Sequence, residues 1–200
     1  ITRGTKGKNA AVAISLQNPE SQAIHLDIRI SQLDFGIKIE LWQEAFKAVE
    51  DIHYLMNIPK RQPHPGKLAE FYAKLGVVFM KANMHLFHAC TRHKLFKLTR
   101  DLRKNLSQQE LSTLASMMLL STMSIPITTV KHGLGKMLDI EGALVEKHQK
   151  MARLLELERT PTRVTLMTDM ISRYGVLQII PKQLVRLYEL LETDDGSLKM

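Results

Sequence analysis

The sequence predicts an all-α fold, a helical-repeat solenoid, and three observations support that class. Apolar residues recur at the helical period along almost the whole chain. Helix start and stop signals divide it into segments of roughly 15–20 residues joined by short loops. Helix pairs follow each other at intervals of about 45 residues, the range of two-helix repeats. Periodicity alone does not separate a solenoid from a compact bundle, but no helix is apolar all round, and this favours the solenoid.

Capping and breaking residues set the expected helices in order. Asn18 and Pro19 start the first, because Asn caps a helix and Pro suits its first position. Asn83 is the expected turn between the third and fourth helices, and Ser107 with Glu110 has capping-box spacing. The expected helices span 19–39, 42–56, 67–82, 84–105, 111–123, 142–155, 161–174 and 181–192. The β-branched segment 176–180 is the one local exception to the helical pattern.

Helical spacing also predicts which side chains form the core. In the first helix Ile24, Ile28, Ile30 and Leu33 share this spacing. Trp42 begins a cleaner stripe in the second, and we expect it in the core rather than as an exposed anchor. That stripe comprises Trp42, Ala45, Phe46, Val49, Ile52 and Met56. Eleven methionines indicate adaptable packing, either in the core or against partner subunits.

The sequence divides into two parts. Residues 1–17 are expected to be a flexible basic approach segment, since 1–9 hold four cations, no acid and almost no apolar residue. Residues 18–200 are expected to form the helical-repeat region. Because the first residue is Ile1 rather than Met, we expect a fragment of a longer protein.

Composition excludes several classes. With 28 Lys and Arg against 20 Asp and Glu, the net charge of +8 suggests an anionic partner, although a merely solvated basic face would explain it equally well. One cysteine rules out an intramolecular disulfide framework and fits a reducing compartment. No apolar run reaches the roughly 20 residues that span a bilayer. We therefore expect a soluble, cytoplasmic protein with no membrane partner.

The residues that could carry chemistry give no enzyme signature. His85, His88, Cys90 and His93 share one helix, but their spacing does not gather three ligands on one face. Partly buried histidines are the favoured interpretation, and a metal-dependent or thiol enzyme is the alternative. Common phosphate-binding, hydrolase and metalloprotease motifs are absent from the sequence. We expect no catalytic residue, no cofactor, no metal and no small-molecule substrate.

The strongest electrostatic signal lies in residues 92–104. Six cations there accompany a single acid, Asp101, and Lys97, Arg100 and Lys104 share a face. Such a stripe can lie along phosphates, which predicts salt-sensitive binding to structured RNA. The alternative is a solvated basic face that contacts an acidic neighbour or nothing. Phe96 is the one candidate for base stacking, and Leu95, Leu98, Leu102 and Leu106 are expected to form the apolar side. The candidate RNA or ribosome contacts are Arg92, Lys94, Lys97, Arg100, Arg103 and Lys104.

Specific strings add a resemblance. The most specific is Glu40-Leu-Trp-Gln-Glu-Ala-Phe-Lys-Ala-Val-Glu-Asp-Ile-His53. Shorter blocks follow in order, among them Asn18-Pro-Glu-Ser-Gln22, Leu86-Phe-His-Ala89, Arg103-Lys-Asn-Leu106, Ser124-Ile-Pro-Ile127 and Val176-Leu-Gln178. Together these blocks resemble the family of the largest subunit of eukaryotic translation initiation factor 3.

The resemblance implies the helical-repeat part of a PCI domain, a right-handed solenoid whose winged-helix module is expected beyond residue 200. It implies a non-enzymatic scaffold that assembles the PCI core, pairs with the c subunit of the factor, and docks on the small ribosomal subunit. Docking would involve rRNA and ribosomal proteins, with mRNA recruited indirectly. The alternative is a scaffold of another PCI assembly, the proteasome lid or the signalosome.

Overall fold

The computed structural model describes residues 18–58, 63–103, 105–127 and 140–197. These residues form helices, turns and loops without a strand, so the all-α prediction is confirmed for this part of the chain. The chain divides into two compact units, one up to Pro63 and one from His64 onward. The approach segment 1–17 and Lys104 lie outside the described residues. A single repeat region over 18–200 stays a prediction.

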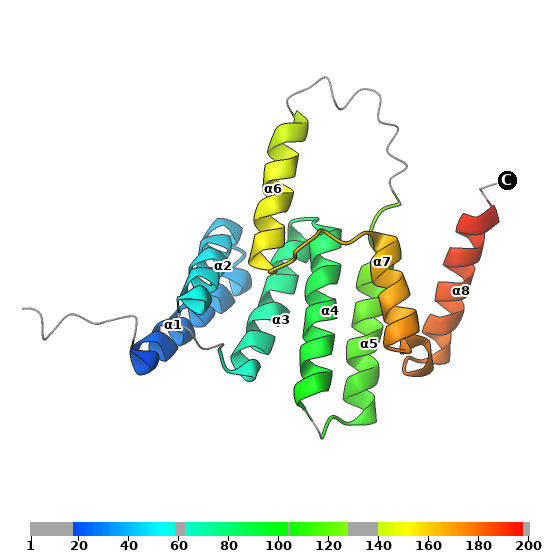
Figure 1. Ribbon diagram of the computed structural model, residues 1–200, viewed down its shortest axis with the longest axis horizontal. Coiled ribbons are helices and arrows are strands. Elements are labelled where there is room, and N and C mark those ends of the chain that lie inside the picture. Colours follow the sequence, from blue (N-terminus) through cyan, green and yellow to red (C-terminus); the bar gives the residue numbers. More distant parts are fainter. Residues whose placement is uncertain (1–17, 59–62, 104, 128–139, 198–200) are drawn as a thin grey trace, which may run out of the picture. The chain divides into compact units, whose positions relative to one another are not determined.

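The first unit is a helical hairpin of α1 (Pro19–Lys38) and α2 (Trp42–Asn57) (Figure 1). The two helices approach closely at Gly36, where an added Cβ would lie 3.1 Å from both the Cβ and the backbone N of Ala45. At the open end, the Gln22 side chain donates a hydrogen bond of 2.7 Å to the Leu55 carbonyl. Gly36 therefore fixes how near the two helices can lie.

Only part of each predicted stripe in this unit is buried. Ile30 and Leu33 are buried in α1, but Ile24 and Ile28 are 61% and 49% exposed, which corrects the prediction. The reason is that α1 is apolar on two sides, and only one side packs against α2. The buried side chains of α2 are Ala45, Ala48, Val49, Ile52 and Leu55, while Trp42, Phe46 and Met56 are half-buried at its margin. The expectation of a core tryptophan is thus only partly met.

The second unit places its helices in a row (Figure 1). Helix α4 (His85–Leu102) packs between α3 (Pro65–Lys81) and α5 (Gln108–Met123). The next to pack on α5 is α7 (Arg163–Thr168), which continues into the π-helix η2 (Asp169–Arg173). The 3-10 helix η3 (Val176–Gln178) and then α8 (Lys182–Ser197) follow. From α3 to α7, each helix of the row thus packs on the next, as expected for a repeat array.

Helix α6 (Ile140–Leu154) departs from this order. It packs against the start of α4, where the rings of Phe87 and His148 meet edge to face with centroids 5.4 Å apart. Met151, Ala152, Leu154 and Leu155 are the buried side chains at its end. Helix α6 therefore lies outside the row, and α7, although it follows α6 in the sequence, packs directly on α5.

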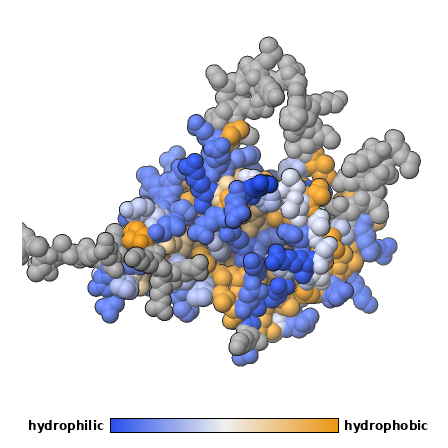
Figure 2. Space-filling model, in the orientation of Figure 1, coloured by the Kyte–Doolittle hydropathy of each residue, from blue (hydrophilic) through white to orange (hydrophobic). Residues whose placement is uncertain are grey.

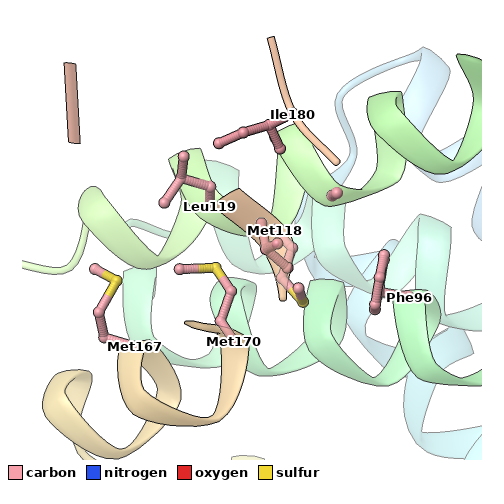
Figure 3. Packing of buried hydrophobic residues seen from close by; sticks show 8 residues of the cluster. Phe96, Met118, Leu119, Met167, Met170 and Ile180 are labelled. Carbon is pink, nitrogen blue, oxygen red and sulfur yellow. The ribbon is translucent and has the colours of Figure 1, made fainter. Parts of the chain in front are cut away.

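The core of the second unit includes a cluster joining α4, α5, α7, η2 and η3 (Figure 3). Phe96, Met118 and Met170 are fully buried in it, and Leu119, Met167 and Ile180 lie beside them. Methionine is flexible enough to fill the irregular space between helices of different pitch. For Met118, Met167 and Met170 the structure supports the plainer of the two interpretations, that methionines fill the core.

Three helices of the chain end in the same way. Glu40, Asn83 and Glu156 have positive φ angles of 58°, 56° and 48°. The residue after each donates its N–H to the carbonyl five positions earlier, for example Met84 to Phe79 at 2.9 Å. This is the Schellman arrangement, which satisfies carbonyls that the helix end leaves without partners. The predicted turn at Asn83 is confirmed.

The predicted capping box at the start of α5 is also confirmed. The Ser107 hydroxyl accepts from the Glu110 N–H at 3.2 Å, and the Glu110 carboxylate accepts from the Ser107 N–H at 3.1 Å. We expect Ser107→Ala to lower the free energy of unfolding by about 1 kcal/mol, because a helix N–H loses its partner. Thermal unfolding followed by circular dichroism measures this. A Ser112→Ala variant within α5 removes a hydroxyl outside the cap, and equal losses from the two variants would contradict the prediction.

The segment after α7 differs most from expectation. Instead of one helix to Tyr174, six residues of α-helix give way to the π-helix, and Gly175 then adopts the left-handed conformation at φ 61°. Residues 176–178 of the following segment form a 3-10 turn, and Val176 within it and Ile180 just after it are buried. A π-turn holds an extra residue, so the side chains after it rotate by about 100° relative to a continuous α-helix.

Candidate nucleic-acid interface

The predicted basic helix is α4 and its C-terminal cap, and its neighbours decide which cations reach solvent. Because α4 packs between α3 and α5 and under α6, its first half is buried on several sides. The buried side chains are Phe87, His88, Ala89, Cys90, Thr91, Leu95, Phe96 and Thr99. The basic residues therefore do not form one uniform stripe.

Two of the six predicted contacts are half-buried between helices. The Arg92 guanidinium lies against α5, with its Nη1 3.9 Å from the sulfur of Met117, and burial lowers its pKa. The Lys94 ammonium lies 5.6 Å from the centroid of the Tyr72 ring of α3. Burial lowers the pKa of Lys94, although Glu156 acts in the opposite direction. Both cations support helix packing and are half-hidden from an outside partner.

Three others are exposed. Lys97 and Arg103 lie open to solvent, and the Arg103 guanidinium is 3.7 Å from the Glu110 carboxylate. The side chain of Arg100 is 39% exposed, with its Nε 3.6 Å from Asp101. Exposed pairs of this kind are weak and do not neutralise a surface. With Lys104 outside the described residues, the accessible part of the prediction is Lys97, Arg100 and Arg103.

A second basic element was missed at the level of sequence. The Arg100 guanidinium lies 4.7 Å from the centroid of the Tyr174 ring, and that of Arg173 lies 5.7 Å from the same centroid. Arg173 ends η2 and is exposed, so it joins the basic surface of α4 from another helix. The signal in the sequence was the dipeptide Arg173-Tyr174, but its orientation depends on the π-turn before it.

Two expectations about the uncharged residues of α4 are corrected. Phe96 is fully buried and cannot stack on a base, because α5 and η2 cover its ring. Of the predicted apolar side, Leu95 is buried, Leu98 and Leu106 are half-buried, and Leu102 is 50% exposed. The buried side chains of α4 extend as far as Thr99, and no buried side chain follows in its last turn.

Figure 2 places this surface in context. The face seen there is mostly hydrophilic, with hydrophobic residues gathered at the lower end of α4 and on α8. Leu102 and, on α8, Leu187, Leu190 and Leu191 are among the exposed large hydrophobic residues. Basic and apolar groups thus lie close together on the second unit.

Comparison with known proteins decides the family. A family model described as the TPR-like region of the PCI domain of eIF3a matches residues 2–199. The chain is 47% identical over 192 residues to the A subunit of eukaryotic translation initiation factor 3 from Danio rerio. It is 46% identical over 192 residues to the human protein of the same name and 42% identical over 195 residues to that of Drosophila grimshawi. The chain belongs to the eIF3a family.

These alignments cover 96% to 98% of the chain but only 14% to 22% of the length of those three relatives. The chain is therefore similar to one region of an eIF3a protein, the TPR-like part of its PCI domain. The predicted family and the helical-repeat fold class are confirmed. Membership of the eIF3a family favours the initiation factor over the proteasome lid and the signalosome.

The histidines and the cysteine of α4 have separate neighbours in this PCI region. His88 Nδ1 lies 2.7 Å from the carbonyl oxygen of Gly76 in α3, and His93 Nε2 lies 2.9 Å from the hydroxyl of Thr122 in α5. Cys90 is 2% exposed, and burial raises the pKa of its thiol to about 12. Among the described residues no three His, Cys, Asp or Glu side chains are placed to hold a metal ion. Within the same residues, no helix has the length and apolarity to cross a bilayer.

His93 gives a pH-dependence that can be measured. Burial lowers its pKa to about 4, with Asp169 acting in the opposite direction, whereas the ordinary value is 6.5. Between these values the unfolded chain binds a proton that the folded chain does not, so stability is lost as the pH falls. We expect a loss of about 2 kcal/mol from this residue between pH 7 and pH 5.

The measurement is urea unfolding at both pH values, for the wild type and for His93→Gln, whose amide can still bond to Thr122. His88, whose pKa burial also lowers, is present in both proteins, so the difference between them isolates His93. Equal losses of stability in the two proteins would contradict the assignment.

Proposed function

We propose that this region acts as a non-enzymatic scaffold within a cytoplasmic subunit of initiation factor 3 and contacts the small ribosomal subunit. Family membership is the observation that supports it most strongly. The arrangement of helices agrees with this role, since stacked helices offer extended surfaces and no cavity lined with reactive groups is needed.

We propose that neighbouring subunits of the factor, the c subunit in particular, cover exposed apolar faces of the helices. In the first unit, one side of α1 presents Ile24, Ile28 and Phe35 at exposures of 49% to 65%. In the second, α8 presents Leu187, Leu190 and Leu191. Contiguous apolar surface of this kind is typical of protein interfaces.

The proposed ribosomal contact uses the cations that remain accessible on α4 and its cap. Lys97 and Arg100 lie one turn apart on α4, Arg103 caps the end of the helix, and all three are exposed. Lys104 stays in the proposal from its place in the sequence. Phosphate contacts of such residues are independent of sequence and weaken with salt. Recruitment of mRNA is then an indirect consequence of holding the factor on the small subunit.

Co-sedimentation of the whole chain with purified small ribosomal subunits over a salt series tests this contact. We expect salt-sensitive binding by the wild type and a loss of about tenfold or more in Lys97→Glu/Arg103→Glu. Arg100 is left intact in this variant because its ring contact could affect folding. Circular dichroism checks that the variant is folded.

The matched control is Lys147→Glu/Arg153→Glu, which changes the net charge equally at two exposed positions of α6. The control should bind like the wild type. Equal binding by all three proteins would show that α4 is not the ribosomal contact. Equal loss of binding in both variants would show that binding depends only on the net charge of the chain and not on the position of the cations. Binding by none of them would contradict the ribosomal contact of this region.

A further inference from the structure

We propose that Arg100 and Arg173, brought together on the ring of Tyr174, form one binding site for the phosphates of an RNA backbone. The proposal rests on the proposed RNA contact and deepens it, because it adds a second helix and a specific geometry to a surface assigned from the charge of α4. Tyr174 acts in it as a positioning residue.

The site is built from two elements far apart in the sequence. Arg100 comes from the last turn of α4 and Arg173 from the end of η2. Their Cζ atoms lie 4.7 Å and 5.7 Å from one ring centroid, so the two charges are no further apart than the sum of these distances. A guanidinium near an aromatic ring is attracted by the π electrons, and this attraction offsets the repulsion between two neighbouring cations.

The ring itself is held in place. Tyr174 is half-buried and packs against the core cluster, where Phe96 meets its edge with centroids 5.6 Å apart at 65°. Arg100 also lies 5.8 Å from the Phe96 centroid. Anchored side chains lose less freedom on binding, so the site is organised before its ligand arrives. A solvated basic face would lack such an anchor.

The chemistry favours phosphate. A guanidinium with its face toward a ring still has N–H groups at its edge, and their fork matches the oxygens of a phosphate. Both arginines are exposed, and Lys97 lies one turn before Arg100 on α4. Asp101 is the acid beside Arg100, at 3.6 Å, and it offsets only part of this charge. A line of cations continuing along α4 suits the regularly spaced charges of a nucleic-acid strand better than an isolated carboxylate.

A fluorescently labelled RNA duplex of about 20 base pairs is the probe, and anisotropy at several salt concentrations is the measurement. Removing one charge with Arg173→Gln is expected to weaken binding about 5–10-fold near 0.1 M salt. It should also reduce the slope of log affinity against log salt by about 0.9. Arg153→Gln on α6 is the matched control, since it removes an exposed arginine elsewhere in the same unit, and it should bind like the wild type.

Variants at Tyr174 test positioning. Tyr174→Phe keeps the ring and should bind like the wild type, whereas Tyr174→Leu keeps apolar bulk but loses the π surface and should weaken binding several-fold. Circular dichroism melting shows whether each variant is folded. In the double variant Arg100→Gln/Arg173→Gln, a loss differing from the product of the single losses would show that the two arginines act as one site.

Three other results would contradict the proposal, and each points to a different explanation. If Arg173→Gln binds the duplex like the wild type while Lys97→Glu/Arg103→Glu loses the ribosome, the stacked arginines are structural and the proposed function stands. If the wild type binds no duplex, the proposal fails. If poly-glutamate of equal charge displaces the duplex as well as unlabelled RNA does, the site recognises acidic protein instead.

Discussion

Replacing Phe96 with alanine is expected to lower the free energy of unfolding of the second unit by about 3–5 kcal/mol. The ring is fully buried where α4, α5 and η2 meet, beside Met118 and Met170 (Figure 3). Truncation leaves a cavity and removes the edge contact with Tyr174. Urea unfolding of both proteins, followed by circular dichroism, measures the loss.

Phe96→Leu is the matched control, because leucine keeps most of the volume, and its expected cost is less than half as large. The pair also tests the corrected role of Phe96. A variant that stays as stable as the wild type but loses RNA binding would restore the ring as a base-stacking residue and contradict its burial.

Replacing Gly36 with valine should open the α1–α2 hairpin at the cost of about 1–3 kcal/mol. The added atoms would meet the backbone of Ala45, which cannot move without shifting α2. The helix propensity gained by losing a glycine is less than about 1 kcal/mol and does not offset this. Hydrogen exchange of the α1 and α2 amides measures the effect within this unit.

Gly66→Val provides the comparison, because a Cβ there would meet the side chain of His64 at 3.3 Å rather than another helix. It should leave the exchange of α1 and α2 unchanged. Unaltered exchange in Gly36→Val would show that the hairpin adapts to the larger side chain.

Much of the helical arrangement could be predicted from short-range signals. Asn18, Asn83 and Ser107 act through hydrogen bonds within a few residues of themselves, so their effect is visible in the sequence. The predicted burial of Ile24 and Ile28 was wrong because a helix with two apolar sides does not reveal which one its neighbour covers. The π-turn at Asp169 left no recognisable pattern in the sequence.

The candidate site was predicted less completely than the fold. Charge located α4, but burial separated Arg92 and Lys94 from the exposed cations. Their neighbours, Met117 and Tyr72, come from the helices on either side of α4, so these contacts could not be predicted from the sequence of α4 alone. Arg173 was missed for the same reason, because only the tertiary structure brings Arg100 to the Tyr174 ring beside it.

The buried Cys90 thiol can serve as a natural probe of local unfolding in the second unit. It is the sole cysteine of the sequence, and its thiol is 2% exposed with a pKa raised to about 12. Because the thiolate is the reactive form, a thiol reagent can modify the protein only during transient exposure of the first half of α4. The labelling rate would therefore give the free energy of that local opening without any engineered probe. A ligand that binds only the closed form of the helical array, whether RNA or a neighbouring subunit, would lower the population of the opened form and so slow the labelling of Cys90.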